Sequence, residues 1–432
     1  MVLSVQSWRS VLIVVVGLLL LAPAASPATD LHMASETIMR GFERKIENGK
    51  ELDAVPVYQY LQLDYGNLKS PGLSLHANGW GRLNLGERYN DKDTAGELLH
   101  AYLQYLSPGR DLLVRAGRQY VFEGVAKDSI DGVYAKTELI PALTLSAYAG
   151  SPVTLGAAKG RQGDLILGGK ISHSRPGLYD LGISYKYLAD NGKRDEESVG
   201  TDLTLLLPGS VYLLGHSAYN LVSGGWKEHS YELRLPLKQF AFHPFFQHYS
   251  YDDYFSNRSN SANPFRFLKD TGNALTVAGT EAFWYLSEQQ EYVLRFKNYD
   301  YDQRFSSSQL YSLLAIWKWK IHTEMGAEFG RMQGNDAENS YFLGRGYFFW
   351  NLKPWFVTGD LMYVSYDQEI YNRDSALFAS LGGGSKFMDD AFSVKLSFDY
   401  SYDPYFDEDY RWMLKLGVPF DKTFETSFWK NW

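Results

Sequence analysis

The sequence contains no cysteine among its 432 residues. This absence excludes disulfide bonds, thiolate metal or iron–sulfur sites, a cysteine nucleophile, a lipid-modified cysteine and the covalent attachment of c-type haem. Basic residues are outnumbered by acidic ones, 42 Lys and Arg against 50 Asp and Glu, which gives a formal net charge of −8. A nucleic-acid-binding protein usually has a basic footprint, so we expect no nucleic acid partner.

Long apolar runs are missing after the first 22 residues, and the mean hydropathy is only −0.30. These two features exclude a membrane protein built from several helical spans. Aromatic residues are abundant instead, with 32 Tyr, 25 Phe and 11 Trp, and there are 39 Gly. The transmembrane β-barrel is one class that is polar on average, rich in Tyr and Gly, and still resides in a bilayer.

Residues 1–28 have the layout of a secretory signal peptide. Arg9 provides a short positive region, an apolar run extends from Val11 to Ala22, and small residues follow as far as Ala28. An uncleaved membrane anchor is the alternative, which the shortness of the apolar run disfavours. We therefore predict an exported protein that crosses a membrane, if at all, with strands.

Beyond about residue 55, apolar and polar residues alternate with a period of two. Between Leu73 and Leu85 the odd positions are Leu, Ala or Gly, whereas the even positions include Ser74, His76 and Arg82. The same alternation recurs from Phe392 to Ser401, and it predicts strands because successive side chains of a strand point to opposite faces. A soluble sandwich with one dry and one wet sheet face would show the same pattern.

Three features favour a membrane barrel over a sandwich. The strands are long, at about 9–13 residues, which a tilted strand needs to cross hydrocarbon. Aromatic residues concentrate at strand ends, as in Trp317 and Trp319, where amphipathic rings would form girdles at the headgroups. The chain also ends at Trp432, and a terminal aromatic residue resembles the signal read by the barrel assembly machinery. We predict an all-β, antiparallel barrel in contact with the lipid of the outer membrane.

Turn signals recur at intervals of about 30–38 residues, each long enough for two strands and a loop. Bacterial barrels have even strand numbers, so the spacing predicts about 22 strands, with 20 the next choice. We assign residues 53–432 to the barrel and residues 29–52 to a separate N-terminal segment in the periplasm, where the pattern around Ile38 and Phe42 resembles a short helix. This assignment creates a conflict, because placing the first short turn in the periplasm requires an additional strand before it. Without that strand, either the first hairpin is atypical or the long loops face the periplasm.

The candidate site consists of charged and polar residues predicted to face the lumen. The stretch from Leu113 to Tyr120 places Arg115 and Gln119 on the polar face, puts Arg118 on the lipid side, and lets Asp131 pair with either arginine across the neighbouring strand. We interpret this group either as an ion pair that stiffens the wall or as a charged constriction. The candidate lumen or constriction residues are Arg82, Arg115, Gln119, Asp131, Lys186, Arg234, Arg295 and Lys297, and further charges predicted to face the lumen are Asp202, Glu232, Lys318, Lys395 and Lys415. The set is mainly basic, which would favour anions or the acidic surface of a protein plug.

No arrangement of residues predicts catalysis or a bound cofactor. The sequence lacks a Gly-x-Ser-x-Gly elbow, and its nine His are scattered without metal-ligand spacing. We therefore expect no catalytic residue, no metal and no cofactor held by this chain, and we regard a barrel enzyme as the least favoured alternative.

Several motifs resemble those of a known group. Gly117-Arg118-Gln119, Phe122-Glu123-Gly124-Val125 and Ile130-Asp131-Gly132 are similar to segments of porin-like barrels from metal-reducing deltaproteobacteria, mainly over residues 55–235. Some members of that group enclose multihaem c-type cytochromes and form conduits for electrons across the outer membrane. The resemblance implies that this chain is the sheath of such a conduit, with haem carried only by its partners. The alternative is a passive pore, open or selective for anions or oligosaccharides.

Overall fold

The computed structural model describes residues 28–45, 51–87, 92–153, 164–254, 274–301, 307–320, 322–388, 391–405 and 408–425. The described chain is almost entirely strand, apart from a helical turn α2 (Tyr251–Tyr254) and a 3₁₀ turn η2 (Ala337–Asn339). The strands of the first half are β1 (Ala28–Lys45), β2 (Glu51–Ala54), β3 (Pro56–Gly66), β4 (Gly72–Asn84), β5 (Thr94–Leu106), β6 (Leu112–Glu123), β7 (Ala126–Ile140), β8 (Leu143–Val153), β9 (Leu165–Arg175), β10 (Tyr179–Asp190) and β11 (Lys193–Leu207). Those of the second half are β12 (Val211–Asn220), β13 (Gly225–Leu237), β14 (Phe240–Ser250), β15 (Ala274–Ser287), β16 (Gln290–Tyr301), β17 (Ser307–Lys320), β18 (Thr323–Gln333), β19 (Tyr341–Leu352), β20 (Trp355–Ile370), β21 (Arg373–Phe387), β22 (Phe392–Tyr402) and β23 (Glu408–Glu425).

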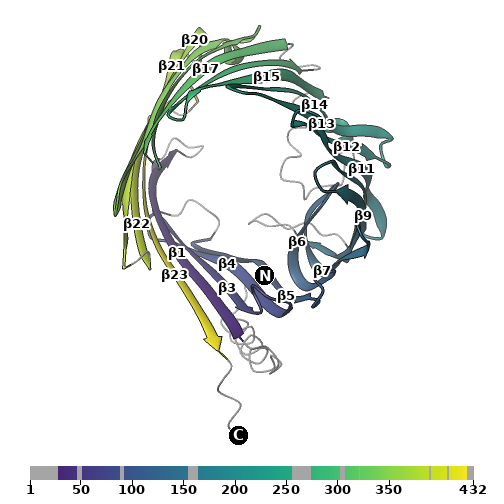
Figure 1. Ribbon diagram of the computed structural model, residues 1–432. Coiled ribbons are helices and arrows are strands. Elements are labelled where there is room, and N and C mark those ends of the chain that lie inside the picture. Colours follow the sequence, from purple (N-terminus) through teal and green to yellow (C-terminus); the bar gives the residue numbers. More distant parts are fainter. Residues whose placement is uncertain are drawn as a thin grey trace.

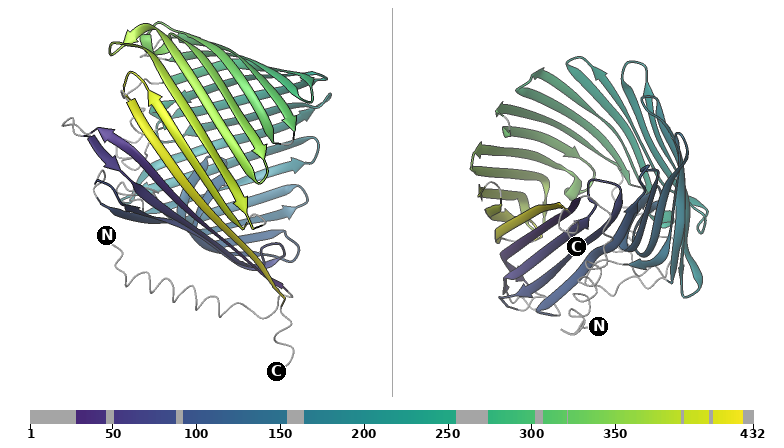
Figure 2. Two further views of the ribbon diagram at one scale, coloured as in Figure 1. Left: turned by 90° about the vertical axis from the view of Figure 1, so that its left-hand side faces the viewer. Right: turned by 60° about the horizontal axis from the view of Figure 1, so that its bottom comes forward.

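These strands form a closed antiparallel barrel (Figures 1 and 2). From β3 onward each strand pairs with its neighbours in sequence, and β1 closes the ring by pairing with β3 on one side and β23 on the other. The short strand β2 pairs with the far end of β1 and leads into β3, so the barrel proper has 22 strands. The predicted fold and strand number are therefore confirmed.

The assignment of residues 29–52 to a separate segment with a short helix is wrong. Residues Ala28–Lys45 form β1, which belongs to the wall and pairs with β23 from Ala28 to Phe42. The apolar residues of this stretch do not face one helix side; Leu31 and Met33 alternate with His32 and Ala34 across the sheet. Pairing on both edges decides the matter, because a strand with two neighbours satisfies its whole backbone. Of the predicted signal peptide only Ala28 lies within the described residues, and Trp432 lies outside them.

The additional strand resolves the conflict in topology. Ala28 pairs with Glu425, so both described ends of the chain lie at the same end of the barrel. The connections from each odd-numbered strand to the next, from β3–β4 to β21–β22, lie at that end, and the longest of them span only residues 67–71 and 107–111. The longest of the connections at the other end, between β14 and β15, spans residues 251–273. Short turns face the periplasm in outer-membrane barrels, so in that orientation both described ends of the chain would lie on the periplasmic side.

Alternation along the strands separates an apolar outer surface from a polar interior. In β22, Leu396 and Phe398 are 42% and 57% exposed on the outside, whereas Ser397 between them is 7% exposed. Large exposed apolar side chains of this kind occur all around the wall, which suits a surface in contact with hydrocarbon. Among the described residues, the structure has no helix with the length and apolarity needed to cross a bilayer.

Single cysteines test the orientation, because the natural chain has none to interfere. Glu288 is exposed in the β15–β16 turn at the end that carries the termini, and Lys193 is exposed beside the β10–β11 turn at the opposite end. We expect a membrane-impermeant maleimide to label K193C on intact cells and E288C only after the outer membrane is permeabilised. The reverse labelling pattern would show that the barrel is inserted the other way round.

Candidate functional site in the barrel lumen

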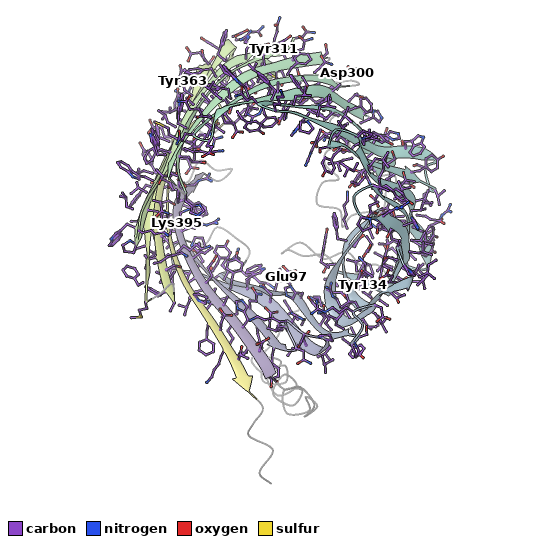
Figure 3. The ribbon with its side chains drawn as sticks, viewed as in Figure 1. Glu97, Tyr134, Asp300, Tyr311, Tyr363 and Lys395 are labelled. Atoms are coloured by element: carbon purple, nitrogen blue, oxygen red, sulfur yellow. The ribbon has the colours of Figure 1, made fainter. Side chains whose placement is uncertain are left out.

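The interior wall is lined by charged residues on neighbouring strands that face one another. The registers place Glu281, Arg295 and Lys297 on the same side of β15 and β16 as Glu328 of β18. Arg295 donates to Glu328 over 2.8 Å and lies 3.4 Å from Glu281, and Lys297 lies 3.6 Å from the same Glu281. Figure 3 shows side chains such as Glu97 and Lys395 lining a central opening, with Tyr311 and Tyr363 on the outer side.

Most of the predicted basic lumen residues have an acidic partner. Lys186 lies 2.8 Å from Asp128 and 2.9 Å from Glu196, and Arg234 lies 2.6 Å from Glu232. Arg82 faces the lumen opposite Tyr58 and donates to the backbone carbonyl of Lys92 over 3.1 Å. The pairing removes the positive excess that the sequence indicates at these positions, because carboxylates from adjacent strands neutralise the bases locally.

Arg115 and Gln119 share the inner face of β6, as predicted, but they play different parts. Arg115 donates to Gln104 over 2.9 Å and lies over the rings of Tyr102 and Tyr134, with centroids at 5.3 and 5.7 Å. Gln119 is only 1% exposed and donates to the carbonyl of Gly132 over 3.3 Å. A side chain this deeply buried contacts no solute, so Gln119 belongs to the packed interior and not to a constriction.

Asp131 takes Arg118, and not Arg115, as its partner. Asp131 is paired in register with Arg118, on the sheet face opposite to Gln119. Arg118 donates to both carboxylate oxygens of Asp131 over 2.8 Å, and it also donates to the carbonyl of Leu98 over 3.2 Å. The sequence left open which arginine would be the partner, and the register selects Arg118 because residues directly opposite in an antiparallel pair share a face.

Beyond Arg118, β6 leaves the wall. Its pairing with β5 covers only Leu113–Arg118, although its pairing with β7 continues to Glu123. We call the segment Gln119–Ile130, which comprises the ends of β6 and β7 and their turn, the inward hairpin. Its turn reaches the inner faces of distant strands: Val125 N donates to Ser184 Oγ of β10 over 3.0 Å. Figure 1 shows β6 and β7 inside the outline of the barrel, where they separate a small lobe from the main opening.

A row of glycines marks the fold line at the base of this hairpin. Gly117 is paired with Gly132, and Gly132 with Gly150 of β8. Gly117 has a φ of +127°, and a Cβ on it would lie 2.3 Å from the carbonyl oxygen of Ala101 in β5. A Cβ on Gly132 would lie 2.1 Å from the carbonyl oxygen of Ala149. The strands can bend inward here because glycine permits both the backbone conformation and the close approach.

The lobe enclosed by the hairpin has a dry core. Ile130, Ile166 and Leu188, from β7, β9 and β10, are all 0% exposed. Each fully buried aliphatic side chain of this size contributes about 1.5–3 kcal/mol. The complete cluster is Val121, Ala126, Ile130, Tyr134, Tyr148, Ile166 and Leu188. Burial of these residues stabilises the hairpin in its inward position.

Two chains of ion pairs connect the hairpin turn to the wall. In the first, Lys127 of the hairpin lies 3.4 Å from Glu228. Glu228 lies 2.9 Å from His216, and His216 lies 2.7 Å from Asp202. In the second, Asp128 contacts Lys186, Lys186 contacts Glu196, and Glu196 contacts Lys227 at 2.8 Å. Adjacent hairpin residues of opposite charge are thus held by opposite charges on β10 and β13. We refer to these contacts as the hairpin latch.

Sequence reasoning placed Lys186 and Asp202 in the lumen, but it missed the other members of the latch, and Lys186 is only 5% exposed beneath the hairpin instead of lining the opening. Lys127 and Asp128 look like an ordinary solvated pair beside a turn, and Glu228 and His216 lie about 100 residues away from them in the chain. The motifs that contain Gly117 and Gly132 lie at the base of the hairpin, but the sequence analysis drew no bend from them and no indication of what the hairpin contacts. In the described part of the chain, no group of three or more His, Asp or Glu residues is placed to hold a metal ion.

No protein-family model and no curated protein matches the chain. Solved structures with a similar arrangement are outer-membrane proteins. OccAB4 of Acinetobacter baumannii has a TM-score of 0.45 at 11% identity, covering 93% of this chain and 100% of that one. The translocation pore of the P pilus usher PapC has a TM-score of 0.47 at 8% identity (90% and 99% covered), and OpdQ of Pseudomonas aeruginosa 0.43 at 9% (90% and 99%). Similarity this low carries no functional argument, and the fold assignment rests on the strand registers.

The fold line is tested by G117A. The substitution places a Cβ against the carbonyl of Ala101 in a left-handed backbone conformation, so we expect the free energy of unfolding to fall by about 1–3 kcal/mol. G81A is the matched control, because a Cβ there would lie 4.0 Å from its nearest neighbour. Urea unfolding of the barrel in lipid vesicles measures both. Equal stability of the two variants would show that Gly117 is not required for the bend.

The latch is tested by reversing the charge of Lys127. K127E places two carboxylates opposite each other, whereas K127R keeps the positive charge opposite Glu228 and is the matched control. Cysteines introduced as V125C and S184C report the hairpin position by disulfide formation, since Val125 N lies 3.0 Å from Ser184 Oγ in the natural chain. We expect the cross-linking yield to fall in K127E and to stay unchanged in K127R. An unchanged yield in K127E would mean that the latch does not hold the hairpin.

Proposed function

We propose that the protein forms the wall of a wide channel in the outer membrane and serves as the sheath of an electron conduit that contains multihaem c-type cytochromes. The observation that carries the proposal is the closed wall of 22 strands with an apolar outside and a charged, wet inside. Such a wall separates hydrocarbon from an aqueous interior and leaves its centre available for a second molecule.

The size of the barrel supports a protein occupant. Strands spaced by about 4.8 Å and tilted by about 40° would place 22 of them on a circle roughly 40 Å across. The inward hairpin uses part of this perimeter for its lobe, but a wide central opening remains between the side chains of the wall (Figure 3). Barrels of 16–18 strands suffice for an aqueous solute pore, and 22-stranded barrels typically hold a plug.

The chemistry of the lining supports the same occupant. Ion pairs such as Arg295–Glu328 and Arg345–Asp360 present alternating charge instead of a field of one sign. A surface of this kind suits the polar exterior of a folded protein, which also carries charges of both signs. Because the chain has no cysteine, covalently attached haem has to come from the partner, which is the division of labour that the resembling group implies.

A diffusion channel for hydrophilic solutes is the second candidate. The polar interior favours it, since paired charges in a water-filled bore let small polar solutes of either sign pass. The two candidates differ in what fills the opening of the native assembly, so composition and conductance distinguish them.

Purification from the native host distinguishes the two functions. We expect a tagged chain, extracted in mild detergent, to bring down a haem-staining protein in about equimolar amount, and the isolated complex to pass electrons into vesicles that contain an acceptor. The chain alone should give a large, steady conductance in planar bilayers, and the complex a much smaller one. A purified chain without haem protein, with the same conductance in native and recombinant preparations, would identify an open pore and reject the sheath.

A further inference from the structure

The outer surface of the barrel carries a furrow over β20, β21 and β22. A cavity of about 510 Å³ lies there, lined by outward residues that include Trp355, Val357, Leu381, Gly383, Leu396 and Phe398. A second cavity of about 350 Å³ continues it toward β23 and shares Leu381 and Phe398 with the first. The lining of the first cavity includes Trp355 and Phe387, whose rings pack against each other at the end of the wall that carries the short turns.

The furrow exists because a side chain is missing where the wall does not require glycine. Three glycines follow one another in β21, and two of them are explained by packing. A Cβ on Gly384 would lie 2.6 Å from the ring of Phe356, and one on Gly382 would lie 2.8 Å from Thr358 Oγ1. A Cβ on Gly383 points outward and would meet only the carbonyl oxygen of Phe356, at 3.2 Å. Its absence opens a groove without relieving a clash with any side chain.

We propose that this furrow binds one acyl chain of an anionic phospholipid from the periplasmic leaflet. The occupant follows from the location, because the furrow lies in the apolar belt that faces hydrocarbon and is continuous with that belt. The first cavity is lined by apolar, glycine and serine residues and offers no charge to a peptide or a soluble ligand. Lys353 is exposed in the turn directly before Trp355, so a phosphate at the headgroup level would meet an ammonium group there.

The test compares two outward glycines. G383L fills the furrow, whereas G346L is the matched control: Gly346 faces outward on β19, a Cβ there would have nothing within 4 Å, and it does not line the furrow. The barrel is reconstituted in vesicles of equal parts phosphatidylglycerol and phosphatidylethanolamine, and retained lipid is counted by native mass spectrometry. Heat-modifiable mobility in gels confirms that each variant is folded.

We expect one phosphatidylglycerol per natural barrel, and the same in G346L. In G383L the leucine side chain fills part of the furrow, so two or more methylene groups of the acyl chain lose their contacts. We therefore expect the barrel to retain phosphatidylglycerol about tenfold more weakly. K353Q should retain a lipid without preference for phosphatidylglycerol. Equal retention in G383L and G346L, or no lipid retained by the natural barrel, would overturn the proposal. The result does not depend on what occupies the bore, so it stands apart from the conduit function.

Discussion

The backbone hydrogen bonds of the strands are the constraint on which the rest of the structure depends. Hydrocarbon offers no partner for a peptide group, so a sheet in a membrane has to close on itself. Closure is achieved here by β1, which pairs with β3 and β23 at once. It follows that an even number of strands returns both ends of the chain to one side, and that side also carries the short turns.

The inward hairpin is a local exception to this constraint, and the structure compensates for it. Where β6 leaves β5, Arg118 donates to the carbonyl of Leu98 and is itself held by Asp131. Pairing with β5 is replaced by burial of Ile130 and its neighbours and by the latch contacts of Lys127 and Asp128. These contacts hold the inward hairpin inside the barrel. There it narrows the passage beside it, and the outer wall from β8 to β13 stays continuous.

The interior and the exterior of the same strands serve different partners. Inside, bases and acids from neighbouring strands neutralise one another, so the lining is polar without a dominant sign. Outside, large apolar side chains are exposed all around the wall, and the contour of this surface varies with their size, as at Gly383. A wall only one sheet thick can carry both functions because adjacent residues point in opposite directions.

The sequence by itself determined the class of fold, the strand number and the inner or outer position of most residues, because all three follow from a period of two and from turn spacing. Gly117 and Gly132 stood out in the sequence only as parts of motifs, and the bend that they permit was decided by the tertiary structure. The first strand was missed because its short stretch of alternation, interrupted by charged residues, also fits a helix, and only its pairing with β23, nearly 400 residues away, settles its conformation. The partners of Asp131, Lys127 and Lys186 were likewise decided by tertiary structure alone, since register and the inward bend bring together charges that no local pattern relates.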